Sequence, residues 1–177
     1  MLTDTVPKPA VIRPATAADL PAVARLCADH AAFERVDPVP ADLAARLAPV
    51  LFADRPRAWC LVVDHGGELI GYATYSREFS TWQAADHVHL DCLFVSEQHR
   101  GAGWGRALLD AVQDAAAAHG AAQLQWQTPH WNTDAIRFYS RAGALARPKV
   151  RFTLPARPAA GPATPWPSPP GPTRPGP

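Results

Sequence analysis

The chain has 177 residues, of which 19% are charged and 47% are hydrophobic, and its formal net charge is +1. This length fits one domain with a hydrophobic core of its own. A charge balance near zero excludes the basic surface typical of nucleic-acid-binding proteins, and no apolar run approaches the roughly 20 residues that span a bilayer. We therefore expect neither nucleic acid nor a membrane as a partner.

The composition of residues 1–10 and the cysteine count indicate the compartment. Residues 1–10 contain no apolar segment, so they do not have the pattern of a signal peptide. Cys27, Cys60 and Cys92 are odd in number and lack the spacing of metal ligands. We expect reduced thiols, a cytoplasmic protein and no metal.

Apolar periodicity predicts strands and helices in alternation along most of the chain. Val11–Arg13 begins a strand, and Thr16 with Asp19 three positions later is typical of a helix start. The same patterns predict helices at residues 20–27, 43–51, 105–119 and 133–142, and strands at residues 59–63, 68–75, 88–95, 123–128 and 150–154, with a hairpin turn at His65-Gly66-Gly67.

From Pro155 onward nearly every second residue is proline, with glycine, alanine and serine between. Such a segment cannot bury apolar surface, which predicts a disordered or polyproline-like tail; a PxxP ligand is the less favoured alternative. The expected layout is a flexible N-terminus at residues 1–10, one domain at residues 11–154 and a proline-rich tail at residues 155–177.

A glycine-rich segment, Arg100-Gly101-Ala102-Gly103-Trp104-Gly105-Arg106, connects the strand at residues 88–95 to a helix. Backbone N–H groups at the start of a helix suit an anion such as a pyrophosphate, and glycines let the backbone approach it closely. Arg100 and Arg106 add positive charge. No Lys-Ser or Lys-Thr follows, which excludes a P-loop, and the glycines are too close together for a dinucleotide fingerprint. An ordinary tight turn remains the alternative.

Two segments together resemble a known family. Arg-x-x-Gly-x-Gly after a strand is similar to the acetyl-CoA pyrophosphate loop of the GNAT N-acetyltransferases, and residues 131–143, Trp-Asn-Thr-Asp-Ala-Ile-Arg-Phe-Tyr-Ser-Arg-Ala-Gly, resemble that family's Asn-x-x-Ala-x-x-Phe-Tyr-x-x-x-Gly helix. The resemblance extends over residues 11–154. It implies a layered α/β (α+β) fold with a mixed central sheet flanked by helices, in which two splayed parallel strands, here residues 88–95 and 123–128, bind acyl-CoA.

Within the family the chain most resembles the diamine (spermidine/spermine-type) acetyltransferases. Residues 12–20, the Phe33-Glu34 pair, residues 71–76, Trp82 and residues 89–91 follow in the expected order. The resemblance implies an enzyme that moves the acetyl group of the co-substrate acetyl-CoA to a primary amine of a small cationic acceptor by direct attack in a ternary complex, and it implies a homodimer. The alternatives are another amine, such as an antibiotic or a peptide N-terminus, and a non-catalytic acyl-CoA-binding module.

The resemblance also assigns the residues that bind acetyl-CoA. It places pantetheine on the main chain of Leu93, Phe94 and Val95, where a backbone N–H would polarise the thioester carbonyl. It places the pyrophosphate on the loop from Arg100 to Arg106, and it adds Asn132, Ala135 and Tyr139 as contacts. Asn132 is also the expected N-cap of its helix.

Tyr139 and Asp91 are the candidate catalytic residues. A phenol with a pKa of about 10 is a reasonable proton donor to a departing thiolate, whose conjugate acid titrates near about 8.5. The alternative for Tyr139 is packing beside Phe138. Asp91 matches the position of a glutamate in the diamine subgroup, and it is either a base acting through water or a carboxylate that only attracts the cation.

Glu34 is the expected anchor of the acceptor, with Phe33 and Trp82 as aromatic walls for a cation. A solvated charge at a helix end is the alternative for Glu34. Gln125, Trp126 and Gln127 match positions that contact substrate in the subgroup. Cys92 stands where the subgroup has a second acid, which favours a less cationic acceptor, such as a lysine-like amino acid or its thioether analogue.

His87 and His89 could indicate a metal site, and Cys92 could indicate a cysteine nucleophile. Two histidines on one strand face without a third ligand indicate a polar face rather than a metal site. No partner identifies Cys92 as a nucleophile, so we expect direct transfer.

Overall fold

The computed structural model describes residues 10–157 of the chain. Its contacts divide the chain into two units, Met1–Ala144 and Leu145–Pro177. All helices and strands of the described residues belong to the first unit. Residues 1–9 and 158–177, for which flexibility was predicted, lie outside the described residues, and the domain boundaries at residues 11 and 154 stay a prediction.

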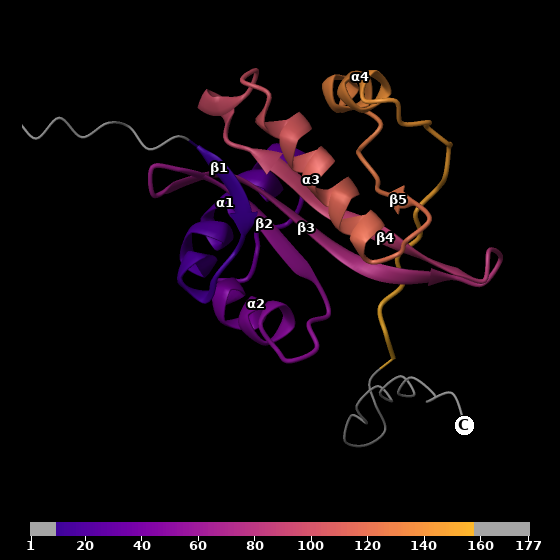
Figure 1. The fold of residues 1–177 in the computed structure, drawn as a ribbon, viewed down its shortest axis with the longest axis horizontal. Coiled ribbons are helices and arrows are strands. Elements are labelled where there is room, and N and C mark those ends of the chain that lie inside the picture. Colours follow the sequence, from indigo (N-terminus) through magenta and orange to yellow (C-terminus); the bar gives the residue numbers. More distant parts are fainter. Residues whose placement is uncertain (1–9, 158–177) are drawn as a thin grey trace, which may run out of the picture. The chain divides into compact units, whose positions relative to one another are not determined.

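One five-stranded sheet forms the centre of the first unit, with the strand order β1-β2-β3-β4-β5 (Figure 1). Neighbouring strands are antiparallel except β4 and β5, which are parallel. The strands are β1 (Val11–Pro14), β2 (Trp59–His65), β3 (Glu68–Ser80), β4 (Ala85–Val95) and β5 (Leu124–Gln125). The mixed sheet flanked by helices confirms the predicted fold class.

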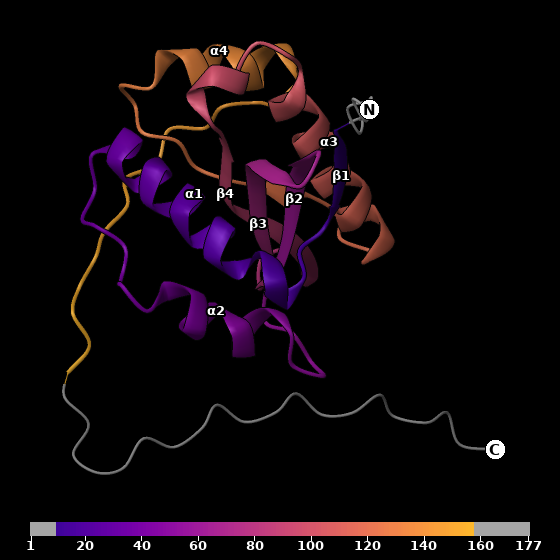
Figure 2. The same ribbon diagram turned by 90° about the vertical axis from the view of Figure 1, so that its left-hand side faces the viewer.

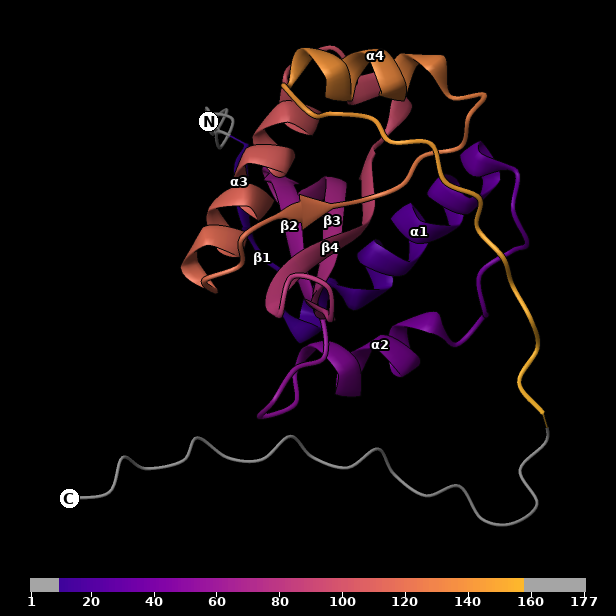
Figure 3. The same cartoon turned by 90° about the vertical axis from the view of Figure 1, so that its right-hand side faces the viewer.

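Helices cover both faces of this sheet. Figure 2 shows α1 (Leu20–Glu34) and α2 (Leu43–Leu51) on one face, and Figure 3 shows α3 (Trp104–Ala118) on the opposite face. In the same two views α4 (Thr133–Arg141) lies at the end of the sheet where β4 leads into α3. Two short 3-10 helices, η1 (Ala17–Asp19) and η2 (Glu97–His99), precede α1 and α3.

Two hydrophobic clusters hold the helices to the sheet. Because successive strand residues point to opposite faces, Val62 packs with α1 and α2 while Val63 packs with α3. Tyr72 and Phe94 belong to the cluster under α1, and the helix contributes Leu20, Val23 and Leu26. The cluster under α3 contains the buried residues Ile70, Val88, Leu90, Leu108, Leu109 and Val112. The sheet is therefore buried on both faces next to β4.

Most predicted elements are confirmed. The hairpin turn forms with Gly66 and Gly67 at φ of 66° and 99°, and Asp64 accepts the N–H of Gly67 at 2.8 Å. Asp19 accepts the backbone N–H of Thr16 at 2.7 Å, which fixes the start that the sequence predicted.

Two predicted strands differ from the structure. Residues 150–154 do not form the predicted strand. A segment with alternating apolar residues forms a strand only where a neighbouring strand offers free backbone groups. Pro148 and Pro155, which flank this segment, also lack the N–H that strand pairing uses. The strand predicted at residues 123–128 is paired only at Leu124–Gln125. The site described below lies beside residues 126–128, which do not pair with β4.

Gly71 sets how closely β3 approaches β4. A Cβ at this position would lie 2.9 Å from the backbone oxygen of Phe94. We expect Gly71→Ala to lower the free energy of unfolding by about 1–3 kcal/mol through overpacking, measured by chemical denaturation. Gly105→Ala is the matched control, because its Cβ would meet only ordinary contacts, 3.7 Å from Phe138, and alanine favours a helix. Equal stability of the two variants would contradict this account.

Candidate active site

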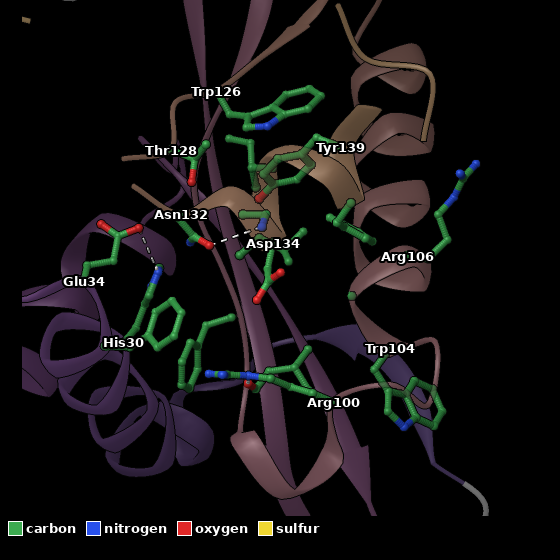
Figure 4. Close-up of a pocket in the computed structure, with 18 of the residues that line it drawn as sticks. His30, Glu34, Arg100, Trp104, Arg106, Trp126, Thr128, Asn132, Asp134 and Tyr139 are labelled. Atoms are coloured by element: carbon green, nitrogen blue, oxygen red, sulfur yellow. Dashed lines mark hydrogen bonds and ion pairs between the residues drawn. The ribbon is translucent and has the colours of Figure 1, made fainter. Parts of the chain in front are cut away.

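The parallel strands β4 and β5 separate after a short paired stretch. They pair only at Val88 with Leu124 and at His89 with Gln125. Beyond these pairs a cavity of about 550 Å³ opens between β4 and residues 126–128 (Figure 4). The backbone of β4 from Leu90 onward therefore has no strand partner on this side, and a ligand with an amide group can pair with it as a further strand.

A β-bulge in β4 marks the point of separation. Thr74 pairs with Cys92 and Tyr75 pairs with Leu90, so Asp91 is the extra residue of the bulge. A bulge bends its strand and redirects a side chain. The Asp91 side chain is exposed and lines the cavity, and the lining also includes Leu93, Phe94 and Val95.

The glycine-rich loop forms one side of the cavity. Gly101 and Gly103 have φ of 80° and 89°, values that favour glycine, and Gly103 is the N-cap of α3. The N–H groups of the first helical turn have no partner within the helix. The loop residues that line the cavity are Arg100, Gly101, Gly103, Trp104, Gly105 and Arg106. This end of the cavity therefore offers backbone donors at a positive helix end.

The two arginines of the loop lie at different ends of the cavity. Arg106 is on α3, and its Nε donates to Asp110 at 2.8 Å and 3.0 Å. The Nε of Arg100 donates to the carbonyl of Val95 at 3.0 Å. The guanidinium of Arg100 lies over the rings of Phe33 and Phe94, at 4.6 Å and 5.4 Å from their centroids. Figure 4 shows it directed toward α1 rather than toward α3.

Helix α4 brings Asn132 and Tyr139 to the cavity. The side-chain oxygen of Asn132 accepts the N–H of Ala135 at 3.1 Å, which confirms the predicted N-cap. Tyr139 packs against Trp126 and Phe138, each with ring centroids 5.0 Å apart, and its hydroxyl points into the cavity (Figure 4). Burial, with smaller contributions from Glu34 and Cys92, raises the pKa of Tyr139 to about 12. The phenol therefore carries its proton at neutral pH.

Acidic side chains gather at the α1 end. Glu34, in the last turn of α1, and Asp91, in the bulge, both line the cavity. His30 lies one turn before Glu34, with its Nε2 3.5 Å from Glu34 Oε1. The cavity thus has backbone donors and Arg106 toward α3 and two carboxylates with Arg100 toward α1. Tyr139 and the carboxylate of Asp134 lie between these ends.

The structure brings most of the predicted site residues to this cavity. Gln127, Ala135, Trp126 and Phe33 also line it. Ala102 and Gln125 do not line the cavity. Trp82 lies in the turn between β3 and β4, is 99% exposed, and is not part of the lining. Phe33 lines the cavity, and the guanidinium of Arg100 covers one face of its ring.

Several lining residues were not predicted: His30, Leu90, His99, Thr128, Asp134, Phe138 and Arg141. His30 carried a signal, because a residue four positions before Glu34 lies on the same helix face. The position of Arg141 depends on how α4 is placed against the sheet, which no local pattern indicates.

Neither a metal cluster nor a membrane segment is found within residues 10–157. No group of three or more histidine, cysteine or acidic residues there could hold a metal ion. His87 lies 3.4 Å from Glu78 through its Nε2. No helix in the same range is long and apolar enough to cross a bilayer.

Comparison with known proteins agrees with this geometry. Residues 25–144 match the model of the acetyltransferase (GNAT) family. The match covers more than half of the chain, so the protein belongs to the GNAT family, and it is an N-acetyltransferase. Acetyl-CoA is the co-substrate that this family uses.

Three curated relatives illustrate the similarity. The chain is 28% identical over 141 residues to mouse thialysine N-epsilon-acetyltransferase, covering 75% of this chain and 82% of that protein. It is 27% identical over 141 residues to human spermidine/spermine N(1)-acetyltransferase-like protein 1, covering 76% of this chain and 20% of that protein. It is 35% identical over 96 residues to phosphinothricin N-acetyltransferase of Alcaligenes faecalis, covering 51% and 47%. The first two relatives are consistent with the diamine-type subgroup.

Solved structures show the same fold. A possible acetyltransferase from Clostridium difficile 630 superposes with a TM-score of 0.72 at 15% identity, covering 84% of this chain and 99% of that chain. The ribosomal-protein-alanine N-acetyltransferase from Brucella melitensis superposes with a TM-score of 0.68 at 21% identity, covering 82% and 99%.

The loop geometry yields a test of acetyl-CoA binding. Gly103→Asp would place a negative charge at the N-terminus of α3, and we expect it to abolish binding, measured by titration calorimetry with acetyl-CoA. Gly120→Asp is the matched control: Gly120 also has a positive φ, 69°, and lies just after the other end of α3, outside the cavity lining. Unchanged affinity in a folded Gly103→Asp protein would contradict a role of the loop in phosphate binding.

Proposed function

We propose that the protein transfers the acetyl group of acetyl-CoA to a primary amine of a small cationic acceptor, either a diamine or a lysine-like amino acid, by direct attack in a ternary complex. The observation that carries this proposal is the polarity of the cavity. Donors for phosphate lie at the α3 end, carboxylates for an ammonium lie at the α1 end, and a protonated phenol lies between them.

The residues at the α3 end fit acetyl-CoA. Its pantetheine contains amide groups, which suit the unpaired backbone of β4 at Leu93, Phe94 and Val95. Its pyrophosphate suits the first-turn N–H groups of α3, with Arg106 beside them. Asn132 and Ala135 border the same space from α4. When bound, acetyl-CoA supplies the activated acyl group as a thioester.

We assign the two proton transfers to Tyr139 and Asp91. The hydroxyl of Tyr139 is a proton donor for a leaving thiolate. Burial raises the pKa of Tyr139, and the same apolar surroundings would also raise the pKa of a thiol formed there, because burial disfavours both anions. Asp91 lines the same cavity, and we assign it to attract the ammonium and to accept its proton, directly or through water.

The charges at the acceptor end favour a zwitterion over a polycation. Glu34 and Asp91 supply two negative charges, whereas the Arg100 guanidinium adds a positive charge directed toward α1. Cys92 is neutral, because burial, together with Asp91, raises its pKa to about 11. A lysine-like amino acid presents an ammonium to the carboxylates and a carboxylate to Arg100. The similarity to a thialysine acetyltransferase supports this choice.

We also propose a homodimer in the cytoplasm. Trp82 is fully exposed on the β3–β4 hairpin and does not reach its own cavity, so its expected role as an aromatic wall requires a second copy of the chain. The cytoplasmic location is supported by three free cysteines.

A thiol-release assay with acetyl-CoA tests the function. The decisive comparison is between a lysine-like amino acid and the diamine that lacks only its carboxylate, with an aminoglycoside and a peptide N-terminus as further acceptors. Turnover of the amino acid at the highest kcat/KM supports the zwitterion, and thiol release with none of these amines would refute the proposed function.

We expect Tyr139→Phe to lower kcat by roughly 10²-fold while leaving acetyl-CoA affinity nearly intact, because only a proton donor of the transition state is removed. Steady-state kinetics with a calorimetric Kd for acetyl-CoA measure both quantities. Tyr75→Phe is the control, since Tyr75 is a buried tyrosine of the sheet core that does not line the cavity. A Tyr139→Phe enzyme with the parent kcat would show that another group protonates the thiolate.

Glu34→Gln keeps the size of the side chain and removes its charge. We expect a raised KM for cationic acceptors, by an amount that shrinks at high salt, and little change for a weakly basic aromatic amine that is neutral at pH 7. Glu68→Gln, at the exposed β2–β3 turn, is the matched control. A cationic-acceptor KM equal to that of the parent would exclude Glu34 as the anchor.

A further inference from the structure

A histidine with no assigned role lies at the acceptor end of the cavity. His30 is four residues before Glu34 on α1, and its Nε2 lies 3.5 Å from Glu34 Oε1, as the dashed line in Figure 4 marks. Its ring stacks on Phe94 with centroids 5.0 Å apart and planes 24° apart. The packing therefore fixes the plane of the imidazole and directs one nitrogen to the carboxylate.

The other nitrogen of His30 meets a buried phenol. The hydroxyl of Tyr72 lies 3.1 Å from His30 Nδ1, and Tyr72 is only 1% exposed. A buried hydroxyl without a hydrogen-bond partner is costly. Burial raises the pKa of Tyr72, so the phenol keeps its proton, and we assign it as the donor to Nδ1. A neutral imidazole that accepts at Nδ1 carries its hydrogen on Nε2, where it faces Glu34.

We propose that Tyr72, His30 and Glu34 form a chain in which His30 is a positioning residue: its Nε2–H holds the carboxylate of Glu34 in the orientation that receives the ammonium of the acceptor. This inference rests on the proposed function, because it takes Glu34 as the acceptor anchor. It adds a residue that determines how well a cationic acceptor binds.

The charge state of His30 is essential to this role. Glu34 from the same helix, Asp91 from β4, Arg100 from the loop and Tyr72 from β3 face the imidazole. Burial, assisted by Arg100, lowers the pKa of His30 more than Glu34 and Asp91 raise it. A neutral imidazole orients Glu34 through an N–H without cancelling its charge, whereas an imidazolium would compete with the acceptor for the same carboxylate.

The kinetic test compares two substitutions of His30. His30→Leu keeps an apolar contact with Phe94 and removes the N–H, and we expect it to raise the KM of a cationic acceptor about tenfold, with the effect carried by KM rather than kcat. His30→Gln places an amide N–H near the position of Nε2 and should recover most of the affinity. His65→Leu, an exposed histidine at the end of β2, should retain the parent KM. Equal defects in His30→Leu and His30→Gln would assign His30 to packing alone and overturn the inference.

A double-mutant cycle links the effect to Glu34. In the Glu34→Gln protein, His30→Leu should raise the KM of the acceptor by less than twofold, because there is no carboxylate left to orient. Independent, additive effects would overturn the inference while leaving Glu34 as the anchor. If Glu34→Gln alone leaves the acceptor KM unchanged, the acceptor mode and the inference both fail.

Nuclear magnetic resonance tests the chain without turnover. The ¹⁵N shifts of the His30 ring at pH 7 should report a neutral imidazole protonated on Nε2, and Tyr72→Phe should shift the tautomer balance toward Nδ1–H. Glu34→Gln should lower the His30 pKa, because it removes an anion that stabilises the imidazolium. An Nδ1-protonated or charged ring in the parent protein, or an unchanged pKa in Glu34→Gln, would refute the chain even in a protein that acetylates no tested amine.

Discussion

The separation of β4 from β5 is the constraint on which the site depends. Pairing stops at His89 and Gln125, and the bulge at Asp91 turns β4 away immediately afterwards. The backbone N–H and C=O groups of β4 that lose their β5 partner would be unsatisfied in a closed core. In the structure they border a cavity instead of packed side chains. The loop at the end of β4 and the N-terminus of α3 then lie at one side of that cavity, because they continue the strand that bends.

The bulge in β4 also determines which face of the sheet each following residue contacts. Cys92, one residue beyond the bulge, contacts the cluster under α1, whereas Leu93 packs with the cluster under α3. Asp91 belongs to neither cluster and is free to line the cavity. β3 approaches the backbone of β4 closely where Gly71 faces Phe94. The ring of Phe94 packs against both His30 and Arg100. One aromatic ring of β4 thus contacts cavity residues from two different elements.

Local patterns predicted the elements, the family and most of the residues at the cavity. Arg-x-x-Gly-x-Gly and the Asn132–Tyr139 segment are local because a loop and a helix start depend on neighbours in sequence. The missed features depend on distant contacts. The side chain of Arg100 lies over Phe33 and Phe94, and β5 stops pairing beside the bulge of another strand. The strand predicted at residues 150–154 does not form, because an alternating apolar pattern predicts a strand without showing that a neighbouring strand is present to pair with it.

The outer part of the β3–β4 hairpin is held less strongly than the rest of the sheet. β2 accompanies β3 only as far as Tyr75, and β5 accompanies β4 only from Val88 to His89. The outer part of the hairpin, which carries the exposed Phe79 and Trp82, therefore has only its own two strands, joined by one ladder of hydrogen bonds and by the pairs Arg77–Asp86 and Glu78–His87. Such a segment opens locally at a lower free energy than the domain unfolds. Substitutions in this outer part therefore cost little stability, so its sequence can change faster than that of the paired strands around it.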